Sequence, residues 1–198
     1  MKEKQQKLEE MTLEELWELF PIILKKHNPN YKKWYIEEKE KLFEILDKDK
    51  IRRINHIGST AVKGLLAKPT VDILLEIDSD YDLEKIKSSL NDDGWILMHE
   101  NDSKKLNIVF NKGYTPEGFA KKVFHLHLRY LGDWDELYFR DYLFAHDEVA
   151  AEYVKLKKSL EKKYKHNRDA YTEAKSDFIK KWTKEARKEF GDKYKIKF

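Results

Sequence analysis

The segment from His56 to Ile77, "HIGSTAVKGLLAKPTVDILLEI", constrains the fold and the function of this chain more than any other. A predicted strand ends at the turn Gly58-Ser59-Thr60, and a nearly continuous apolar run at 70–77 is typical of a central strand that is covered on both faces. Such a turn exposes backbone N–H groups beside two hydroxyls and can hold a phosphate. Asp72 lies inside the apolar run, where a carboxylate could bind a divalent cation. The segment therefore predicts a phosphate-binding turn beside a carboxylate.

The residues around this segment predict helices before and after a strand-rich middle region. Apolar spacing favours helices over 12–27, where Pro21 kinks or divides the helix, and over 31–48. We expect strands at 51–57, 70–77, 95–98, 105–113 and 122–131. A surface helix is expected at 81–94, and a connection rich in turn formers at 111–118. After Gly132 we expect three helices, at about 134–145, 148–164 and 169–188.

This order of elements predicts an α/β (α+β) fold, in which a mixed sheet of about five strands is backed by helices. A chain of 198 residues without a low-complexity linker fits one domain over 1–198. Within that domain we expect a helical N-terminal segment at 1–48, a sheet core at 51–131 and C-terminal helices at 134–188.

The composition excludes several kinds of site and location. No cysteine is present, so disulfides, thiolate zinc sites and cysteine nucleophiles are excluded. No apolar run approaches the roughly 20 residues that span a bilayer. The charged start "MKEKQQKLEE" lacks the apolar segment of a signal peptide. We therefore expect a cytoplasmic protein with no membrane partner.

The formal net charge of +3 is distributed unevenly along the chain. Residues 155–198 hold 16 Lys and Arg against 7 Asp and Glu. This basic region could attract phosphates or nucleic acid, or it could form a solvated helix face. Because no recognisable RNA-binding motif is present, we expect a nucleotide or another phosphorylated small molecule, and not a nucleic acid, as the partner.

Five sequence segments together resemble a known family: "HIGSTAVKGLLAKPTVDI" (56–73), "FHLHL" (124–128), "LYFRDYLFAH" (137–146), "AAEYVKLKKSL" (150–160) and "DAYTEAKSDFI" (169–179). Over about 29–181 the chain resembles the GrpB family, bacterial proteins that are assigned to the nucleotidyltransferase superfamily. The resemblance implies a nucleotidyltransferase-like mixed sheet with N-terminal helices and a C-terminal segment of three helices. It also implies a link to nucleotide-like or coenzyme metabolism, because some relatives carry a similar domain joined to dephospho-coenzyme A kinase.

The core motif of that superfamily is a Gly-Ser turn followed by an Asp-x-(Asp/Glu) strand, and this chain matches only part of it. Gly58 and Ser59 match the phosphate-binding turn, and Asp72 matches the first metal-binding carboxylate. The second carboxylate is expected at position 74, which is Leu74 here. Glu76 is a poor replacement, because the rise of a strand places it about 13 Å from residue 72. The resemblance thus implies Asp72 and Ser59 as catalytic residues, with Gly58 and Thr60 beside them in the nucleotide site.

Two histidines in "FHLHL" are candidate metal ligands. His125 and His127 alternate with apolar residues, so both side chains point to one face of a strand, about 6.6 Å apart. If this strand lies beside 70–77, Asp72 and the two histidines could bind a divalent metal such as Mg²⁺, Mn²⁺ or Zn²⁺. Alternatively, the histidines could hydrogen-bond polar groups or bind a substrate phosphate as imidazolium.

Further candidates for substrate binding are a lysine before the apolar strand and residues of the C-terminal helices. Lys68 is placed to neutralise a phosphate, and Arg140 could bind one bidentately, while its neighbour Asp141 faces another direction on the helix. Tyr171 and Lys175 are four residues apart and share one helix face, which suits a base and a phosphate but also suits helix packing.

Two functions fit these observations. One is metal-dependent nucleotidyl or phosphoryl transfer to a small molecule, with Asp72 and the histidines on the metal and the basic residues on the phosphates. The other is a non-catalytic nucleotide- or phosphate-binding module, a degenerate transferase. Leu74 counts against a mechanism with two metal ions and fits the binding module.

Overall fold

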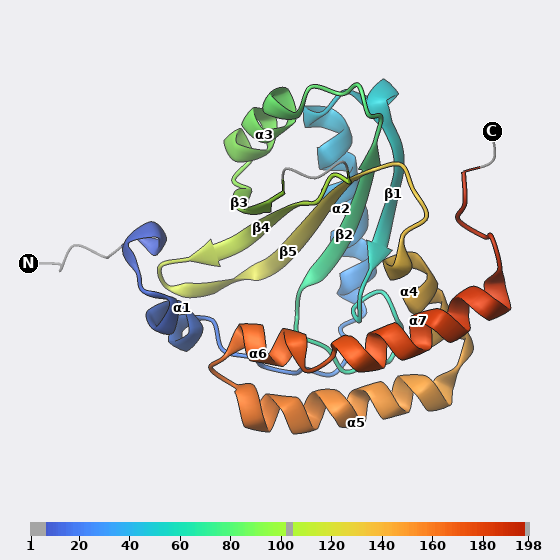
Figure 1. Cartoon of the computed structure of the whole chain (residues 1–198). Coiled ribbons are helices and arrows are strands. Elements are labelled where there is room, and N and C mark those ends of the chain that lie inside the picture. Colours follow the sequence, from blue (N-terminus) through green and yellow to red (C-terminus); the bar gives the residue numbers. More distant parts are fainter. Residues whose placement is uncertain (1–6, 102–104, 197–198) are drawn as a thin grey trace, which may run out of the picture.

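A computed structural model describes residues 7–101 and 105–196 of the chain. It consists of a five-stranded mixed sheet with helices against both faces (Figure 1). The expected α/β (α+β) class is thereby confirmed, with N-terminal helices, a central sheet and a C-terminal helical segment. Among the helices of 7–101 and 105–196, none combines the length and the apolar character that a bilayer span requires.

The five strands are β1 (Ile51–Ile57), β2 (Val71–Ile77), β3 (Ile96–Glu100), β4 (Ile108–Thr115) and β5 (Gly118–Tyr130). The α-helices are α1 (Leu13–Leu19), α2 (Asn30–Ile45), α3 (Leu83–Asp92), α4 (Asp135–Ala145), α5 (Asp147–Tyr164), α6 (Arg168–Glu173) and α7 (Ser176–Phe190). Two short 3₁₀-helices, η1 and η2, cover Leu8–Glu10 and Lys48–Lys50.

The strand order is β1-β2-β5-β4-β3, and only the β2–β5 pair is parallel. Because β2 has a hydrogen-bonded neighbour on each side and helices on both faces, almost every residue of β2 is buried. This position explains the continuous apolar run at 70–77. The register places Asp72 opposite Ile57 of β1 and His125 of β5, in the middle of the sheet.

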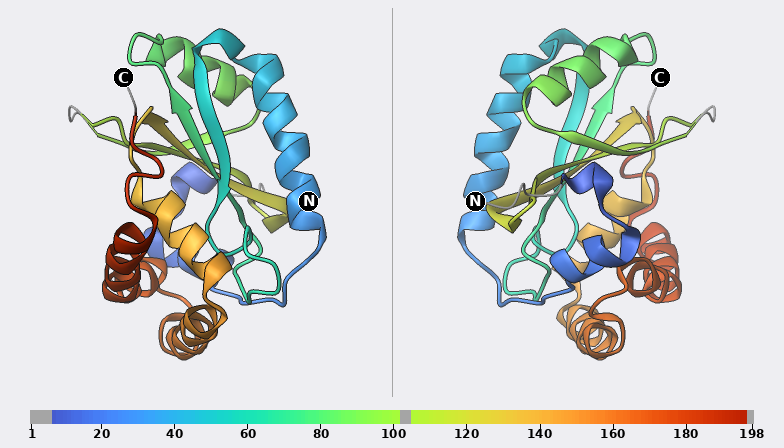
Figure 2. Two further views of the ribbon diagram at one scale, coloured as in Figure 1. Left: turned by 90° about the vertical axis from the view of Figure 1, so that its right-hand side faces the viewer. Right: turned by 90° about the vertical axis from the view of Figure 1, so that its left-hand side faces the viewer.

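The side chains on the two faces of β2 point toward different parts of the molecule. Val71, Ile73, Leu75 and Ile77 join the main hydrophobic core with residues of α2 and α3. The alternating residues Asp72, Leu74 and Glu76 point to the opposite face. Figure 2 shows α2 and α3 on one side of the sheet and α4, α5 and α7 on the other. The polar positions of β2 therefore face the C-terminal helices.

The C-terminal helices pack on one another around a second apolar core. Tyr142, Tyr153 and Ala186 are buried in this core, and the ring of Phe178 on α7 stacks on the ring of Tyr153 on α5 at 5.2 Å between centroids. Val62, in the connection after the Gly58-Ser59 turn, is buried in the same core. The turn is thus held between the sheet and the helical layer, with α5, α6 and α7 lying across the end of the sheet where β2 begins (Figure 1).

Two expected boundaries are wrong. The helix expected over 12–27 ends at Leu19, and the chain after Pro21 is extended, with a β-bridge between Lys25 and Ala67. Proline lacks an N–H group and its ring disfavours helical geometry in the residue before it, so Phe20 leaves the helix. The turn expected over 111–118 is also much shorter, because β4 continues to Thr115 and β5 begins at Gly118.

The third C-terminal helix, expected over 169–188, is divided into α6 and α7. The division lies at Ala174 and Lys175, which keep right-handed backbone angles. Lys175 precedes the first turn of α7, so the break lets its side chain reach toward the end of the sheet.

Candidate functional site

The turn after β1 requires glycine at its first position. Gly58 has a φ of +69°, in the left-handed region that residues with a Cβ rarely adopt. A Cβ added to Gly58 would also lie 2.3 Å from Oδ2 of Asp72. The backbone at Gly58 therefore lies so close to the Asp72 carboxylate that a residue with a Cβ would clash with it.

Thr60 holds this turn against the start of β2. Its buried hydroxyl donates to the carbonyl oxygen of Thr70 at 2.9 Å, so Nε2 of His56, 3.0 Å away, must donate to it. Burial lowers the pKa of His56 to about 4, and the ring is neutral. The predicted nucleotide ligand Thr60 thus has its hydroxyl engaged in fixing the turn.

Asp72 is hydrogen-bonded by His125, the residue opposite it on β5. Nδ1 of His125 lies 3.1 Å from Oδ1 of Asp72, while Nε2 lies 2.8 Å from the Tyr114 hydroxyl and 2.9 Å from Nη2 of Arg168. A guanidinium only donates, so Nε2 accepts and the proton of the neutral ring is on Nδ1, from which it is donated to Asp72. Burial lowers the pKa of His125 to about 4.

The Asp72 carboxylate is ionised although its side chain is only 26% exposed. Burial alone raises the pKa of Asp72, but the hydrogen bond from His125 and the positive charge of Lys68 contribute to lowering it to about 2. His127 lies opposite Leu74 on the same face and makes no side-chain hydrogen bond to another described residue. Burial also lowers the pKa of His127.

The sequence predicted a metal centre made of Asp72, His125 and His127. The three residues do share one face of the sheet, but the Nδ1 proton of His125 points at Asp72 and its Nε2 lone pair accepts hydrogen bonds. Only Asp72 and His127 keep donors for a metal ion, and in the described part of the chain no three His, Asp or Glu side chains are grouped to hold one. The donor set as arranged here does not fit a two-histidine, one-carboxylate centre. Metal binding by Asp72 stays a prediction.

The remaining positions on this face of β2 are structural. Leu74 is fully buried against Ile57 and Leu137 of α4, in an apolar contact that has no place for a metal ligand. Glu76 is also fully buried, and its Oε1 accepts from Nη2 of Arg53 at 2.6 Å and from the backbone N–H of Gly132 at 3.1 Å. Glu76 therefore joins β1, β2 and the loop before α4.

Four cationic side chains face Asp72 from the surrounding elements: Lys68, Lys157, Arg168 and Lys175. Lys157 of α5 is only 3% exposed, and its ammonium donates to Oγ of Ser59 at 3.0 Å and to the carbonyl oxygen of Leu66. Lys175 and Lys68 lie 4.5 Å and 5.7 Å from the centroid of the buried Tyr171 ring.

Burial makes these lysines unusually acidic. It lowers the pKa of Lys157 to about 7 and that of Lys175 to about 8, and neighbouring cations contribute to both shifts. The pKa of Lys68 lies well below its usual value for the same reasons. The three lysines are thus poorly hydrated, and together with Arg168 they line a cavity that contains one carboxylate among its described lining residues.

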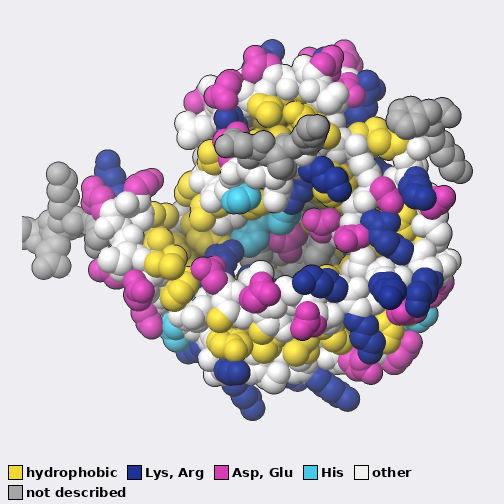
Figure 3. Space-filling model, in the orientation of Figure 1, with side chains coloured by type: hydrophobic (Ala, Val, Ile, Leu, Met, Phe, Trp, Pro, Cys, Tyr) yellow, Lys and Arg dark blue, Asp and Glu magenta, His cyan; other side chains and the backbone are white. Residues whose placement is uncertain are grey.

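These residues enclose a cavity of about 330 Å³, the basic lobe, between the sheet and α5–α7. Besides the four cations, the cavity is lined by Gly58, Ser59, Thr60, Thr70, Asp72, His125, His127, Tyr153, Tyr171 and Thr172. A second cavity of about 870 Å³, the large lobe, shares five of these residues, among them Ser59, Asp72 and His127. Figure 3 shows this side of the molecule hollowed between the sheet and the helical layer, with histidine side chains in the hollow.

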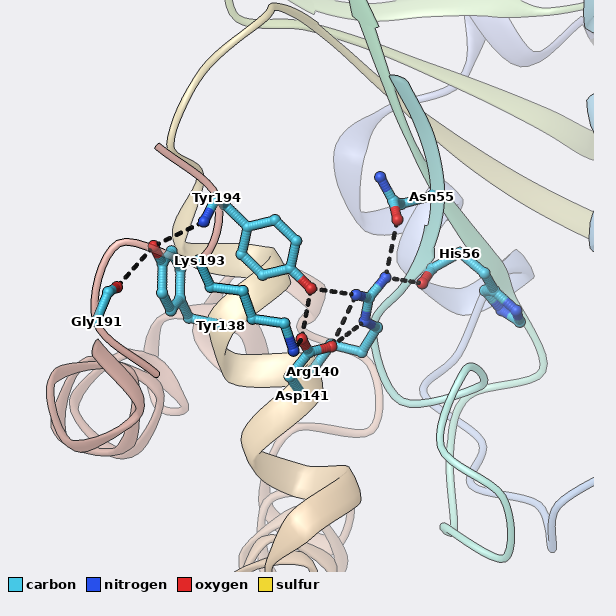
Figure 4. A network of polar contacts seen from close by, with 8 residues as sticks. All are labelled: Asn55, His56, Tyr138, Arg140, Asp141, Gly191, Lys193 and Tyr194. Carbon is cyan, nitrogen blue, oxygen red and sulfur yellow. Dashed lines mark hydrogen bonds and ion pairs between the residues drawn. The ribbon is translucent and has the colours of Figure 1, made fainter. Parts of the chain in front are cut away.

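Arg140, a predicted phosphate ligand, lies away from both lobes. Its guanidinium donates to Oδ1 of Asn55, to the carbonyl oxygen of His56, to Asp141 and to the hydroxyl of Tyr194 (Figure 4). The expectation that Arg140 and Asp141 face different directions is wrong, because the long arginine side chain folds back to Oδ1 of Asp141 at 2.7 Å. Arg140 anchors α4 and the C-terminal segment to β1.

The structure brings most of the other predicted residues together and adds some that the sequence did not single out. Ser59, Lys68, Asp72, Tyr171 and Lys175 all line the basic lobe. Lys157 and Tyr153 were not predicted to do so. A signal for them was present in the sequence: they continue the buried face of α5 with Val149 and Leu160, and a lysine on such a face calls for an explanation.

The fold and the cavity define an α/β (α+β) protein whose Gly-Ser turn and partly buried carboxylate face a cationic cavity. The family model described as GrpB protein matches residues 21–185. The chain belongs to the GrpB family, as the sequence segments indicated.

Three similar proteins illustrate this membership. The glutamate-rich protein GrpB of Alkalihalophilus pseudofirmus is 36% identical over 164 residues, which cover 80% of this chain and 91% of that protein. The UPF0157 protein YqkA of Bacillus subtilis is 31% identical over 157 residues, which cover 78% of this chain but only 44% of YqkA. The crystal structure of the conserved protein GrpB from Enterococcus faecalis superposes with a TM-score of 0.70 at 28% identity, covering 85% of this chain and 99% of that one.

Proposed function

We propose that this chain binds the phosphate groups of a nucleotide, or of a nucleotide-like phosphorylated small molecule, in the basic lobe. The observation that carries the proposal is the convergence of four cations on a cavity in which Asp72 is the only carboxylate among the described lining residues. Phosphate is the common biological anion that such a cluster of lysine and arginine side chains would recognise.

The Gly58-Ser59 turn supports the same assignment. The backbone N–H groups of Ser59 and Thr60 donate to no acceptor among the described residues, and both residues line the basic lobe. Free N–H groups in a tight turn are a common phosphate-binding arrangement. The large lobe, lined by Trp134, Phe139 and several charged residues, leaves room for the rest of the ligand beside the phosphates.

The geometry favours a binding module over a metal-dependent transferase. Leu74 is sealed by apolar contacts and His125 is engaged by hydrogen bonds, so the donors of a metal centre are incomplete. Transfer is the second candidate, and the position of Asp72 in the lining of both lobes favours it, because a group bound across the two lobes would pass this carboxylate.

A calorimetric titration with ATP, GTP, CTP and UTP, with and without Mn²⁺, tests the proposal. At least one nucleotide should bind, and Lys175→Met should weaken that binding at least tenfold, because a charge-assisted hydrogen bond contributes about 1.5–3 kcal/mol. Lys180→Met is the matched control, since Lys180 is an exposed lysine of α7 that lies outside the cavity.

Equal affinities of the parent and of Lys175→Met would contradict the placement of the phosphates in the basic lobe. Consumption of the nucleotide during the titration would favour transfer over simple binding.

A further inference from the structure

The four cations of the basic lobe have no carboxylate partner among the described residues, whereas several other partly buried cations of the described chain do. Lys112 pairs with Glu38 at 2.6 Å, Arg53 pairs with Glu76, and Arg187 pairs with Asp133. Lys68, Lys157, Arg168 and Lys175 form no ion pair with any carboxylate of the described residues. Buried charges are normally paired, so this exception indicates an anion that the site is built to receive.

The contacts of the four cations with the described residues are made with neutral groups. Lys157 donates to two neutral oxygens, Oγ of Ser59 and the carbonyl of Leu66. Lys68 and Lys175 approach the Tyr171 ring, and Arg168 donates to His125 and lies 5.3 Å from the centroid of the Tyr114 ring. Each cation is therefore held in place by a neutral group, and its charge is left for a ligand.

The amount of charge indicates the class of ligand. Four cations against Asp72 give the basic lobe a formal charge of +3 when all four are protonated. A single terminal phosphate carries roughly −1.5 to −2 at pH 7, and each further phosphate of a chain adds about −1. A diphosphate or triphosphate group balances the lobe, whereas one phosphate leaves it with excess positive charge.

Many phosphate-transfer sites bring a second source of positive charge, a Mg²⁺ ion that is held by one or two carboxylates and by the phosphates of the substrate. Here the second carboxylate position is the buried Leu74, and His125 has no free donor for a metal. Lys157 of α5 and Lys175 at the break between α6 and α7 line the same lobe as Asp72.

We propose that the basic lobe binds a diphosphate or triphosphate group without a divalent cation, and that Lys157 and Lys175 supply the positive charge that a metal ion would otherwise supply. This inference rests on the proposed function and specifies its ligand and its mode of binding.

The titration behaviour of the lysines gives the proposal a distinctive signature. In the free protein the pKa of Lys157 is about 7 and that of Lys175 is about 8. The titratable and charged groups around them are Lys68 before β2, Asp72 of β2, Tyr153 of α5, and Arg168 and Tyr171 of α6. A bound polyphosphate favours the charged lysines and raises both pKa values. Between about pH 7 and pH 9 binding therefore takes up protons, and the affinity falls as the pH rises. Well below pH 7 both lysines are already charged and the uptake disappears.

The test is a titration of the whole chain with inorganic tripolyphosphate in EDTA at pH 8, in two buffers of different ionisation enthalpy. The parent should bind in EDTA, and Lys157→Met should weaken binding at least tenfold. Lys158→Met, the exposed neighbour of Lys157, should bind like the parent. On binding, the parent should also take up more protons than Lys157→Met. Protonation of tripolyphosphate itself contributes to both measurements and cancels when the two proton uptakes are subtracted. Lys157→Met should remain folded, because it removes an unpaired buried cation.

A second variant, Asp72→Asn, separates the two modes of binding. Without a metal ion, the Asp72 carboxylate repels the phosphates, so Asp72→Asn should bind tripolyphosphate in EDTA at least as tightly as the parent. Binding that requires Mg²⁺ or Mn²⁺ and is lost in Asp72→Asn would overturn the inference while leaving the proposed function in place. Failure of tripolyphosphate and of every nucleotide to bind, with or without a metal ion, would overturn both.

Discussion

At the scale of single residues, the candidate site contains ionisable side chains in positions that are partly or fully shielded from water. Lysine is rarely buried, yet Lys157 is 3% exposed without a carboxylate partner. The sequence alone predicted Ser59, Lys68 and Asp72, which line the basic lobe, because they lie in one short segment with a recognisable spacing. It could not predict the position of Lys157, because Lys157 reaches Ser59 across 98 positions of the chain, a contact that only the packing of α5 creates. For the same reason Arg140 was expected at the phosphates, although the fold directs it to Asn55 and Tyr194.

The close contact between Gly58 and Asp72 leads to a prediction about stability. Gly58→Ala should reduce the free energy of unfolding by more than about 2 kcal/mol, because it combines an unfavourable φ with a clash against the carboxylate. Gly64→Ala is the matched control, since Gly64 has a φ of +83° but no atom within 4 Å of its added Cβ. Urea denaturation of both variants measures the difference in the free energy of unfolding. Equal losses in the two variants would contradict the prediction, because they would show that the Asp72 side chain can move away from the added Cβ without destabilising the fold.

A second prediction separates Glu76 from the ligand site. Glu76→Gln should reduce the free energy of unfolding by about 3 kcal/mol, because it leaves Arg53 without its buried carboxylate partner. Nucleotide affinity should stay within about twofold of the parent. Glu40→Gln, an exposed position on α2, should change neither quantity. A large loss of affinity in Glu76→Gln with unchanged stability would instead assign Glu76 to the site.

At the scale of elements, the periodic patterns predicted which segments are strands and helices, and local chemistry decided where they end. The run at 70–77 is a central strand, as its apolar character indicated, and Pro21 ends α1 earlier than the apolar spacing suggested. The division between α6 and α7 contains no glycine or proline to mark it, so the sequence predicted one helix there. That division matters for the site because it positions Lys175.

The two faces of β2 give a prediction for Leu74. Leu74→Met should reduce the free energy of unfolding by less than about 1.5 kcal/mol, because it conserves the volume packed against Ile57 and Leu137. Leu74→Asp should reduce it by more than about 3 kcal/mol, because it buries a carboxylate in an apolar contact. Thermal unfolding with and without Mn²⁺ distinguishes the possibilities. Restoration of the Leu74→Asp variant to parental stability by Mn²⁺ would show that this position faces a metal site after all.

At the scale of the whole molecule, the cavity lies between two layers that are distant in sequence. The sheet contributes the Ser59 turn and Asp72, and the helical layer contributes Lys157 and Lys175. The overall class and the family could be predicted from the sequence, because they depend on the order of the elements and on short motifs. The cationic cavity could not, because its charge balance depends on which side chains the docking of α5–α7 brings to the end of the sheet.

The most direct measurement of the central claim is a crystal structure of the chain with tripolyphosphate and Mn²⁺, using the anomalous signal of manganese. We predict phosphate density within hydrogen-bonding distance of Lys157 and Lys175 and beside the N–H groups of the Ser59 turn, with no anomalous peak at Asp72. Density that lies elsewhere, or a manganese peak that joins Asp72 to the phosphates, would contradict the account.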